Sequence, residues 1–208
     1  MNFDTLAGPV GALLLGYLLG SIPFGLLLTR LTGAGDLRKV GSGNIGATNV
    51  LRTGRKGLAA LTLLLDAAKG AAAILLVRLV FPGEPQLDPL AAFGALLGHL
   101  FPVWLRLRGG KGVATLIGIL TALSWQVALA AILVWLAMLA VTRYSSVAGM
   151  TMALAAPVSA AILGRFDLAL LFLGFGLLVV WKHRANLERL MSGTEPRVGA
   201  SRGDTADA

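Results

Sequence analysis

The chain has 208 residues, of which 56% are hydrophobic and only 13% are charged. Soluble domains carry about 25% charged residues, so the composition indicates an integral membrane protein. The absence of cysteine and the presence of only two histidines, His99 and His183, exclude a disulfide framework and a cysteine- or histidine-rich metal site. The net charge of +8 comes from basic residues that flank apolar runs. We therefore expect membrane lipids and anionic molecules as partners, and no nucleic acid.

The first apolar run, residues 6–31, is long enough to cross a bilayer, which takes about 20 residues. It exceeds the apolar part of a signal peptide, contains Pro9 and Pro23 and follows no basic segment, so we interpret it as a retained transmembrane helix. Close packing against another helix is predicted at four glycines near one face: Gly8, Gly11, Gly16 and Gly20.

A polar loop, residues 32–56, follows this run and is rich in glycine and small polar residues between Gly41 and Asn49. Glycines permit backbone turns closed to other residues, and Arg52 offers a fixed fork of donors suited to phosphate. By itself the loop fits an anion-binding nest and a flexible polar connector equally well, because lone glycine-rich loops are weak motifs. The candidate ligands are Ser42, Gly43, Asn44, Gly46, Thr48, Asn49 and Arg52.

The second predicted span, residues 57–81, carries Asp66 and Lys69 within its apolar sequence. Residues three apart share a helix face, so the two charges can neutralise each other. An internal ion pair that holds the helix beneath the loop is favoured over a substrate contact, because each charge accounts for the presence of the other.

The third predicted span, residues 89–107, leads into a second glycine-rich turn, Gly109-Gly110-Lys111-Gly112. This turn opens an apolar segment, and helix N-termini attract anions. Lys111 adds a positive charge to such a site. The alternative, that Lys111 only signals topology, leaves the small residues around it unexplained. The G-x-x-x-x-G-K-[ST] spacing of nucleotide-binding loops is absent.

Four more apolar runs complete the chain: residues 113–123, 124–141, 147–163 and 168–181. The first is only about half a bilayer long at about 1.5 Å per residue. Counting it as a span places nearly all Lys and Arg on one side, as the positive-inside rule requires. If it were only re-entrant, the basic tail would face outward.

We therefore predict an all-α, polytopic membrane helix bundle of about seven spans, with the N-terminus outside and the C-terminus in the cytoplasm. Residues 1–197 are expected to form one membrane-embedded domain. The last residues, 198–208, are rich in Ser, Gly, Asp and Ala, and we expect them to be disordered.

A third polar segment directly follows the last span and begins at His183. His183, Asn186 and Arg189 recur every three residues, so on a helix they form one stripe. A lone histidine there would be read as interfacial, but a His–Asn–Arg stripe is better explained as a site. Arg184 and Glu188 are expected to form a solvated i,i+4 pair.

Catalytic motifs of hydrolases are missing: there is no G-x-S-x-G elbow and no traceable Ser–His–Asp order. Phosphate-binding segments with few acids fit transfer from an already activated donor. An alcohol that attacks an acyl phosphate needs positioning and charge neutralisation more than a strong protein nucleophile.

Taken in order, residues 41–49, 98–112 and 183–195 resemble the three cytoplasmic motifs of the PlsY family, the bacterial acyl-phosphate:glycerol-3-phosphate acyltransferases. The resemblance extends to about Arg197 and includes the Asp66–Lys69 segment. Neither histidine is followed five residues on by the aspartate of the H-x-x-x-x-D motif of other glycerol-phosphate acyltransferases, since Trp104 and Glu188 stand there.

The resemblance implies transfer of a fatty acyl group from acyl phosphate to the 1-hydroxyl of sn-glycerol 3-phosphate, which yields lysophosphatidic acid and phosphate. This is the first acylation of phospholipid biosynthesis. It implies no cofactor, no metal and no acyl-CoA or acyl carrier protein as direct donor. It further implies an inner-membrane location with the site on the cytoplasmic face.

The resemblance also implies roles for single residues. The Ser42–Asn49 loop and the Gly109–Gly112 turn would cradle the donor phosphate, and an apolar groove would hold the acyl chain. Asp66, Lys69 and Glu195 would be structural. Substrate binding would include Arg189, and catalysis would fall to Arg52, Lys111, His183 and Asn186. The residues implied to hold glycerol 3-phosphate are Arg52, Lys111, Ser145 or Ser146, His183 and Asn186.

Two points stay open at the level of sequence. The hydroxyl proton would pass to the donor's own phosphate or to His183, whose unperturbed pKa near 6.5 suits a general base. Other classes of function are a phosphate-ester transporter, which predicts midplane sites and an internal repeat, and a non-catalytic membrane scaffold.

Overall fold

The computed structural model describes residues 3–199, with side chains from Leu6 onward. These residues form ten α-helices and three short 3-10 turns and contain no strand. Five segments are long and apolar enough to cross a membrane, and α9 (Phe166–Lys182) and α10 (Arg184–Met191) together form a sixth, bent by 57°. The predicted all-α membrane fold is confirmed, whereas the count of seven spans and the orientation of the termini stay predictions.

The chain divides into two compact units, Met1–Leu129 and Ala130–Ala208, and the division falls within α7 (Trp125–Thr142). The expectation of one domain over residues 1–197 stays a prediction. Of the expected disordered tail, only residues 198 and 199 belong to the described part of the chain, and residues 200–208 lie outside it.

The first apolar run is broken in the structure, where one continuous helix was expected. Helix α1 (Phe3–Gly20) ends before a short break, and α2 (Phe24–Leu31) begins after it. Pro23 explains the break, because proline lacks an N–H donor and disfavours helical geometry in the residue before it.

Three further helices complete the first unit: α4 (Lys56–Val80), α5 (Asp88–Leu100) and α6 (Val113–Leu123). The prediction that the third helix reaches residue 107 is wrong, since α5 ends at Leu100 and a 3-10 turn, η3 (Val103–Leu105), follows. Pro102 stands between them and again disfavours continuation of the helix. Another 3-10 turn, η2 (Pro85–Leu87), precedes α5.

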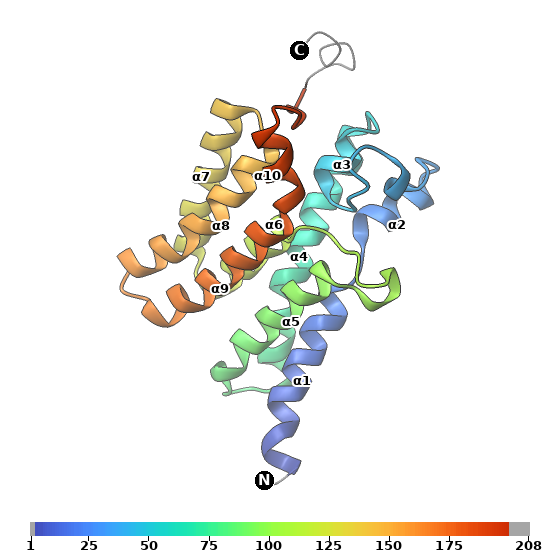
Figure 1. Ribbon diagram of the computed structural model, residues 1–208. Helices are drawn as coiled ribbons and strands as arrows, with labels where there is room; N and C mark the ends of the chain where they lie inside the picture. Colours follow the sequence, from blue (N-terminus) through green and yellow to red (C-terminus); the bar gives the residue numbers. More distant parts are fainter. Residues whose placement is uncertain (1–2, 200–208) are drawn as a thin grey trace. The chain divides into compact units, whose positions relative to one another are not determined.

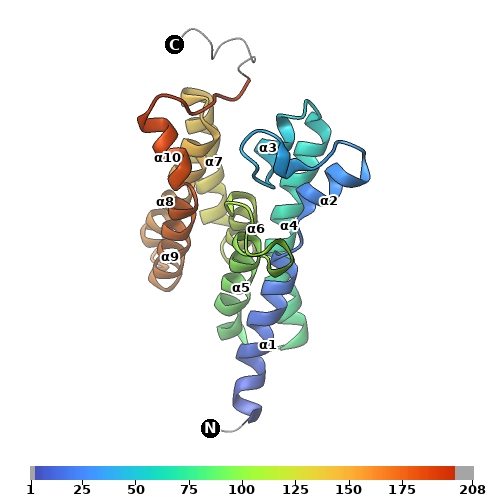
Figure 2. The same ribbon diagram turned by 45° about the vertical axis from the view of Figure 1, so that its right-hand side comes forward.

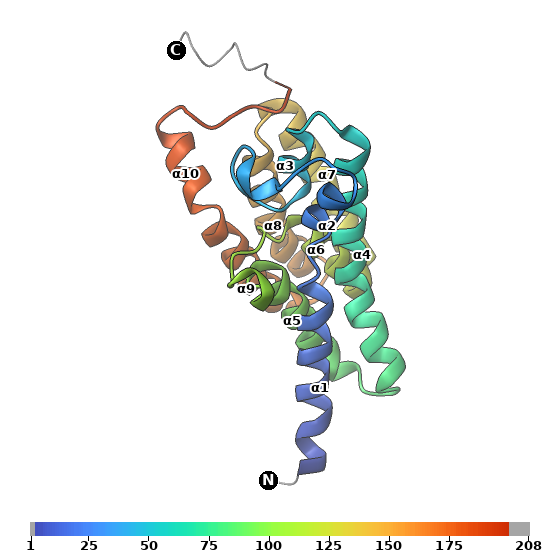
Figure 3. The same cartoon turned by 90° about the vertical axis from the view of Figure 1, so that its right-hand side faces the viewer.

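Helices α1 and α5 pack side by side, as Figures 1 and 3 show. A side chain at Gly16 would overlap the carbonyl of Ala91, and one at Gly20 would overlap the carbonyl of Ala95. Small residues at such positions let two backbones approach closely in a membrane. The predicted close packing is therefore confirmed at Gly16 and Gly20, whereas Gly8 and Gly11 lie against the side chains of Leu87 and Phe81. Similar approaches join α4 to α6, where Gly118 lies against the carbonyl of Ala67.

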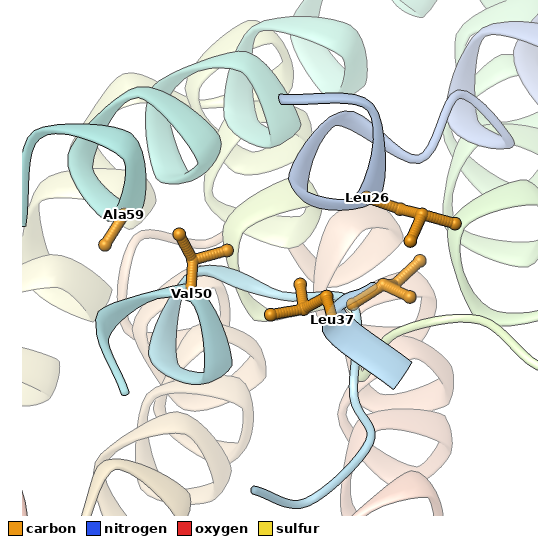
Figure 4. Close-up of a cluster of buried hydrophobic side chains, with 5 residues drawn as sticks. Leu26, Leu37, Val50 and Ala59 are labelled. Atoms are coloured by element: carbon orange, nitrogen blue, oxygen red, sulfur yellow. The ribbon is translucent and has the colours of Figure 1, made fainter. Parts of the chain in front are cut away.

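The polar loop after α2 is a folded element with a small core of its own. It contains η1 (Leu37–Lys39) and α3 (Ala47–Leu51). Figure 4 shows Leu26 of α2, Leu37, Val50 and Ala59 of α4 gathered in one buried cluster, which also includes Ile45. A segment with buried side chains from four elements is not a flexible connector, so that alternative is wrong.

The second unit is built on α8 (Ser145–Ile162) and α9, which pack along each other (Figure 2). Phe172 and Phe175 are fully buried in this unit. After α10 the chain folds back, and the Val198 N–H donates to the carbonyl of Arg143 over 2.7 Å. The Arg143 guanidinium donates in turn to the Val198 carbonyl over 3.2 Å.

The close approach of α1 and α5 predicts unequal effects of two glycine substitutions. Gly16→Ala should lower the free energy of unfolding by about 1–3 kcal/mol, since the new methyl group meets backbone atoms. Gly174→Ala is the matched control, because nothing lies within 4 Å of a side chain added there. It should leave Tm unchanged or raise it, since alanine favours helix by about 1 kcal/mol over glycine. Equal shifts in Tm, measured by thermal unfolding in detergent, would contradict the packing described.

Candidate active site

The break between α1 and α2 leaves backbone carbonyls without helical partners, and two distant side chains satisfy them. The Lys69 Nζ donates to the carbonyl of Ile22 over 2.7 Å, and the Trp104 indole donates to the carbonyl of Ser21 over 2.7 Å. In a membrane such groups must be paired within the protein. The backbone at the break is therefore held in place by two side-chain hydrogen bonds, and α2 and the polar loop follow it in the chain.

Lys69 also forms the expected ion pair, with its Nζ 2.6 Å from Asp66 Oδ1. Both side chains are buried. The Nδ1 of His99, on α5, lies 3.8 Å from the same carboxylate oxygen. The charges of this buried pair bind each other, and Lys69 also binds a backbone carbonyl. These contacts support the structural role expected for Asp66 and Lys69.

The glycine-rich turn rests directly on the end of α5. The Gly109 and Gly110 N–H groups donate to the carbonyls of Leu100 and His99 over 3.2 Å and 3.0 Å. Gly112 has φ +87° and is the residue before α6, a left-handed conformation that favours glycine. Lys111, between Gly110 and Gly112 in the chain, is half-buried. The turn therefore presents a lysine at the N-terminus of an 11-residue helix, where the helix dipole favours an anion.

Asn49 is the centre of the polar loop. Its buried amide nitrogen lies 3.0, 2.9 and 2.8 Å from the carbonyls of Leu37, Val40 and Asn44. Its Oδ1 accepts the Ser42 N–H over 3.2 Å. The side chain is thus occupied by the loop's own backbone, and Asn49 acts on the loop's shape.

Several backbone amides that could have formed an anion nest close the loop instead. The Gly43 N–H donates to the Val40 carbonyl over 2.9 Å, and the Gly46 N–H donates to Asn44 Oδ1 over 2.9 Å. Gly41 has φ +53°, and a side chain there would meet both Asn49 Oδ1 and the Arg52 side chain. Arg52 therefore lies across the loop, while its side chain remains exposed.

His183 stands where α9 ends and α10 begins. Its ring is buried, and its Nδ1 lies 2.7 Å from the carbonyl of Val179. Because a carbonyl only accepts, Nδ1 carries the proton, and in the neutral ring Nε2 is the acceptor. The α9 backbone thus sets both the orientation and the tautomer of the imidazole.

Glu195 joins α8 to α10 in the second unit. Its Oε1 accepts from the Ser146 hydroxyl over 2.7 Å and from the Asn186 amide over 2.6 Å, and its Oε2 accepts from Arg189 Nε over 2.7 Å. Burial alone would raise the pKa of Glu195, but these three hydrogen bonds and the Arg189 charge together lower that pKa below its ordinary value of 4.5. The geometry supports the structural role expected for Glu195.

The same contacts orient Asn186. Only the amide nitrogen can donate to a carboxylate, so the other amide atom, Oδ1, is directed elsewhere. That oxygen is buried and has no hydrogen-bond partner among the described residues. Buried acceptors in native proteins are nearly always paired, so Asn186 Oδ1 is suited to accept a hydrogen bond from a ligand.

The remaining candidate residues are found in both units. Ser146 is buried and bound to Glu195, whereas Ser145 is half-buried at the first position of α8. Arg184 lies over the Trp181 ring, 4.7 Å from its centroid, and the expected Arg184–Glu188 pair is absent from the ion pairs found among residues 3–199. Ser42 and Thr48 are exposed on the polar loop.

Sequence reasoning assigned no role to Trp104 or His99, although both lie in the second motif. An indole and an imidazole at the end of an apolar run are ordinary interfacial residues in a sequence, and only the fold brings them to Ser21 and Asp66. Among residues 3–199 there is no group of three or more His, Asp or Glu side chains placed to hold a metal ion.

Known proteins resemble the chain over most of its length. A sequence model of the family described as "Glycerol-3-phosphate acyltransferase" matches residues 10–193. A glycerol-3-phosphate acyltransferase of Mesorhizobium japonicum is 57% identical over 193 residues, which cover 93% of this chain and 97% of the relative. One from Novosphingobium aromaticivorans is 58% identical over 188 residues, covering 90% and 94%.

Two solved structures that resemble the chain are also of a glycerol 3-phosphate acyltransferase. The crystal structure of the glycerol 3-phosphate form of PlsY, an integral membrane glycerol 3-phosphate acyltransferase, is 38% identical with a TM-score of 0.85, and covers 92% of this chain and 96% of that one. The lysophosphatidic acid form is 35% identical with a TM-score of 0.83, and covers 92% and 95%. These similarities favour an acyltransferase over the transporter and scaffold alternatives.

The lowered pKa of Glu195 predicts a pH-dependent contribution to stability. A carboxyl group whose pKa is lowered in the folded state stabilises it above the unfolded-state pKa and loses that effect as pH falls through the folded-state pKa. Glu195→Gln should therefore lower the free energy of unfolding by about 2 kcal/mol near neutral pH. The difference between wild type and variant should shrink in acid, where wild-type Glu195 becomes protonated.

The measurement is thermal unfolding of both proteins at a series of pH values. Glu188→Gln is the control, because Glu188 is an exposed acid on α10 and its replacement should have little effect at any pH. A constant difference between wild type and Glu195→Gln down to the lowest pH would contradict the assignment.

Proposed function

Because the chain belongs to the glycerol-3-phosphate acyltransferase family of PlsY, we propose that it transfers a fatty acyl group from acyl phosphate to the 1-hydroxyl of sn-glycerol 3-phosphate. The products are lysophosphatidic acid and phosphate. The protein is a multi-pass membrane acyltransferase of lipid biosynthesis, and the choice of donor is the new part of the proposal. We place the reaction on the cytoplasmic face of the bacterial inner membrane, where the positive-inside rule puts the basic segments.

One observation carries the proposal: a glycine turn presents the half-buried Lys111 at the N-terminus of α6. This combination favours a phosphate, through the helix dipole and the lysine charge. An acyl phosphate carries its phosphate next to the acyl carbonyl. The turn would therefore bind the donor directly, without a carrier protein or coenzyme.

The polar loop is assigned to the same donor. Ser42 and Thr48 are exposed hydroxyl side chains of this loop and would bind phosphate oxygens. Gly43, Asn44 and Gly46 shape the loop around them. Asn49 is assigned a positioning role, because its amide is occupied by four backbone groups of the loop.

The acceptor is assigned to a second group of residues, which shares Lys111 with the donor site. Arg52 and Lys111 would bind the phosphate of glycerol 3-phosphate, and Ser145 would add a hydrogen bond. Asn186 Oδ1, the buried acceptor without a partner among the described residues, would accept from a glycerol hydroxyl. Ser146 and Arg189 act through Glu195, which holds Asn186 in this orientation.

In the reaction, the oxygen of the glycerol 1-hydroxyl attacks the acyl carbonyl carbon. An ester bond forms, the bond between the acyl carbon and the phosphate oxygen breaks, and phosphate leaves. Lys111 and the helix N-terminus would stabilise the negative charge that develops on the departing phosphate. We propose that this phosphate takes the hydroxyl proton. The rival acceptor is His183 Nε2, which the bond from Nδ1 to Val179 leaves as the acceptor of the neutral ring.

The function is tested with purified full-length protein in detergent, glycerol 3-phosphate and one of three acyl donors. Acyl phosphate should support formation of lysophosphatidic acid, whereas acyl-CoA and acyl carrier protein should not. Product from either carrier-bound donor at a rate equal to or above that with acyl phosphate would overturn the proposed donor. Folded protein that forms no product with any donor would overturn the enzymatic proposal.

Arginine variants in the polar loop provide a matched comparison in the same assay. Arg52→Ala should raise KM for glycerol 3-phosphate by about tenfold or more, because it removes a charged phosphate contact. Arg38→Ala changes an exposed arginine of the same loop that pairs with Asp36 and should change KM by less than about twofold.

The proton acceptor is tested with His183→Gln. If the donor phosphate takes the proton, the variant should mainly raise KM for glycerol 3-phosphate, because only an acceptor contact is lost. The pH dependence of kcat should keep its form. A large loss of kcat with KM little changed, together with the disappearance of an inflection near about pH 6–7, would identify His183 as the base instead.

A further inference from the structure

We propose that His99 is a positioning residue for the Gly109–Gly112 turn. Its imidazole forms the surface on which Gly110 rests, and it thereby sets the place of Lys111 and of the α6 N-terminus. The inference rests on the phosphate-binding function proposed above for this turn. It concerns the side of the turn that contacts the end of α5.

The contact between His99 and Gly110 leaves no space for a side chain. A methyl group on Gly110 would overlap the Nε2, Cε1 and Cδ2 atoms of the His99 ring. One on Gly109 would overlap the ring of Pro102 and the carbonyls of His99 and Leu100. Both glycines are therefore in close contact with the end of α5. The imidazole occupies the volume that a side chain at position 110 would need.

The other side of the His99 ring faces the ion pair of α4. The ring is buried, and Nδ1 lies 3.8 Å from Asp66 Oδ1. Asp66 is fixed by Lys69, which is bound to the carbonyl of Ile22. The ring is thus placed between the ion pair of α4 and the turn, so a rigid part of the bundle supports Gly110.

The backbone alone does not supply this support. The hydrogen bonds from Gly109 and Gly110 to α5 fix the turn along the helix end. Contact with the Nε2 edge of the buried His99 ring adds a steric restraint at Gly110. A displacement of about 1 Å at a substrate-positioning group can cost about 100-fold in rate, so the support has a measurable consequence.

A double-mutant cycle of His99→Ala and Gly110→Ala tests the contact. Each single change should reduce kcat/KM for acyl phosphate by about tenfold or more, mainly through KM, because the turn loses its support or is pushed from it. Removing the ring creates the space that the Gly110→Ala methyl group needs. The double variant should therefore be no more than about threefold worse than the more impaired single variant.

Leu96→Ala serves as the control partner for Gly110→Ala. Leu96 is fully buried on α5, one turn before His99, so its truncation should lower Tm without relieving the overlap at Gly110. The effects of Leu96→Ala and Gly110→Ala on kcat/KM should simply multiply. Multiplicative effects for His99→Ala and Gly110→Ala as well would overturn the proposal.

His99→Asn is the substitute if His99→Ala does not fold, because asparagine keeps a polar atom toward Asp66 but is shorter toward Gly110. Failure of both variants to fold would also overturn the proposal, since His99 would then hold the helix bundle and not the turn. Inactive wild-type protein would count against the proposed function. Active wild type with a multiplicative cycle would count against the role of His99 alone.

Discussion

The buried ion pair of Asp66 and Lys69 is the interaction on which the first unit depends. Lys69 neutralises Asp66 and also donates to the carbonyl of Ile22, where the first span breaks. Nothing in a hydrocarbon environment could replace either contact. The break then allows α2 and the polar loop to leave the direction of α1. The same pair lies beside His99. The ion pair therefore contacts both the start of the segment that leads to the polar loop and the histidine that lies against the glycine turn.

Each of the three motifs contains residues that build the site as well as residues suited to bind a ligand. Asn49 closes the polar loop, His99 lies beneath the glycine turn, and Glu195 joins α8 to α10. All three are buried. Substrate contacts are assigned to exposed or half-buried members, such as Arg52 and Lys111, and to the buried Oδ1 of Asn186.

Local signals predicted much of the fold. The bounds of α6 were predicted at residues 113–123 from the apolar run, and the Asp66–Lys69 pair followed from helical spacing. The break at residues 21–23 and the early end of α5 were missed, although Pro23 and Pro102 marked them. The role of Asn49 and the contact of Lys69 with Ile22, 47 residues away, could not be predicted, because they depend on tertiary placement. A glycine-rich loop looks alike in sequence whether its amides bind an anion or close the loop.

The position of Glu195 in the chain has a consequence for biosynthesis. The carboxylate that orients Asn186 and binds Ser146 follows α10 and is made after every membrane helix. Domains generally fold in the order in which they leave the ribosome. The polar cluster of the second unit therefore cannot form until residue 195 has emerged, and a partly synthesised chain already inserted in the membrane still lacks the fixed asparagine. The order of synthesis therefore makes this polar cluster one of the last parts of the described chain to form.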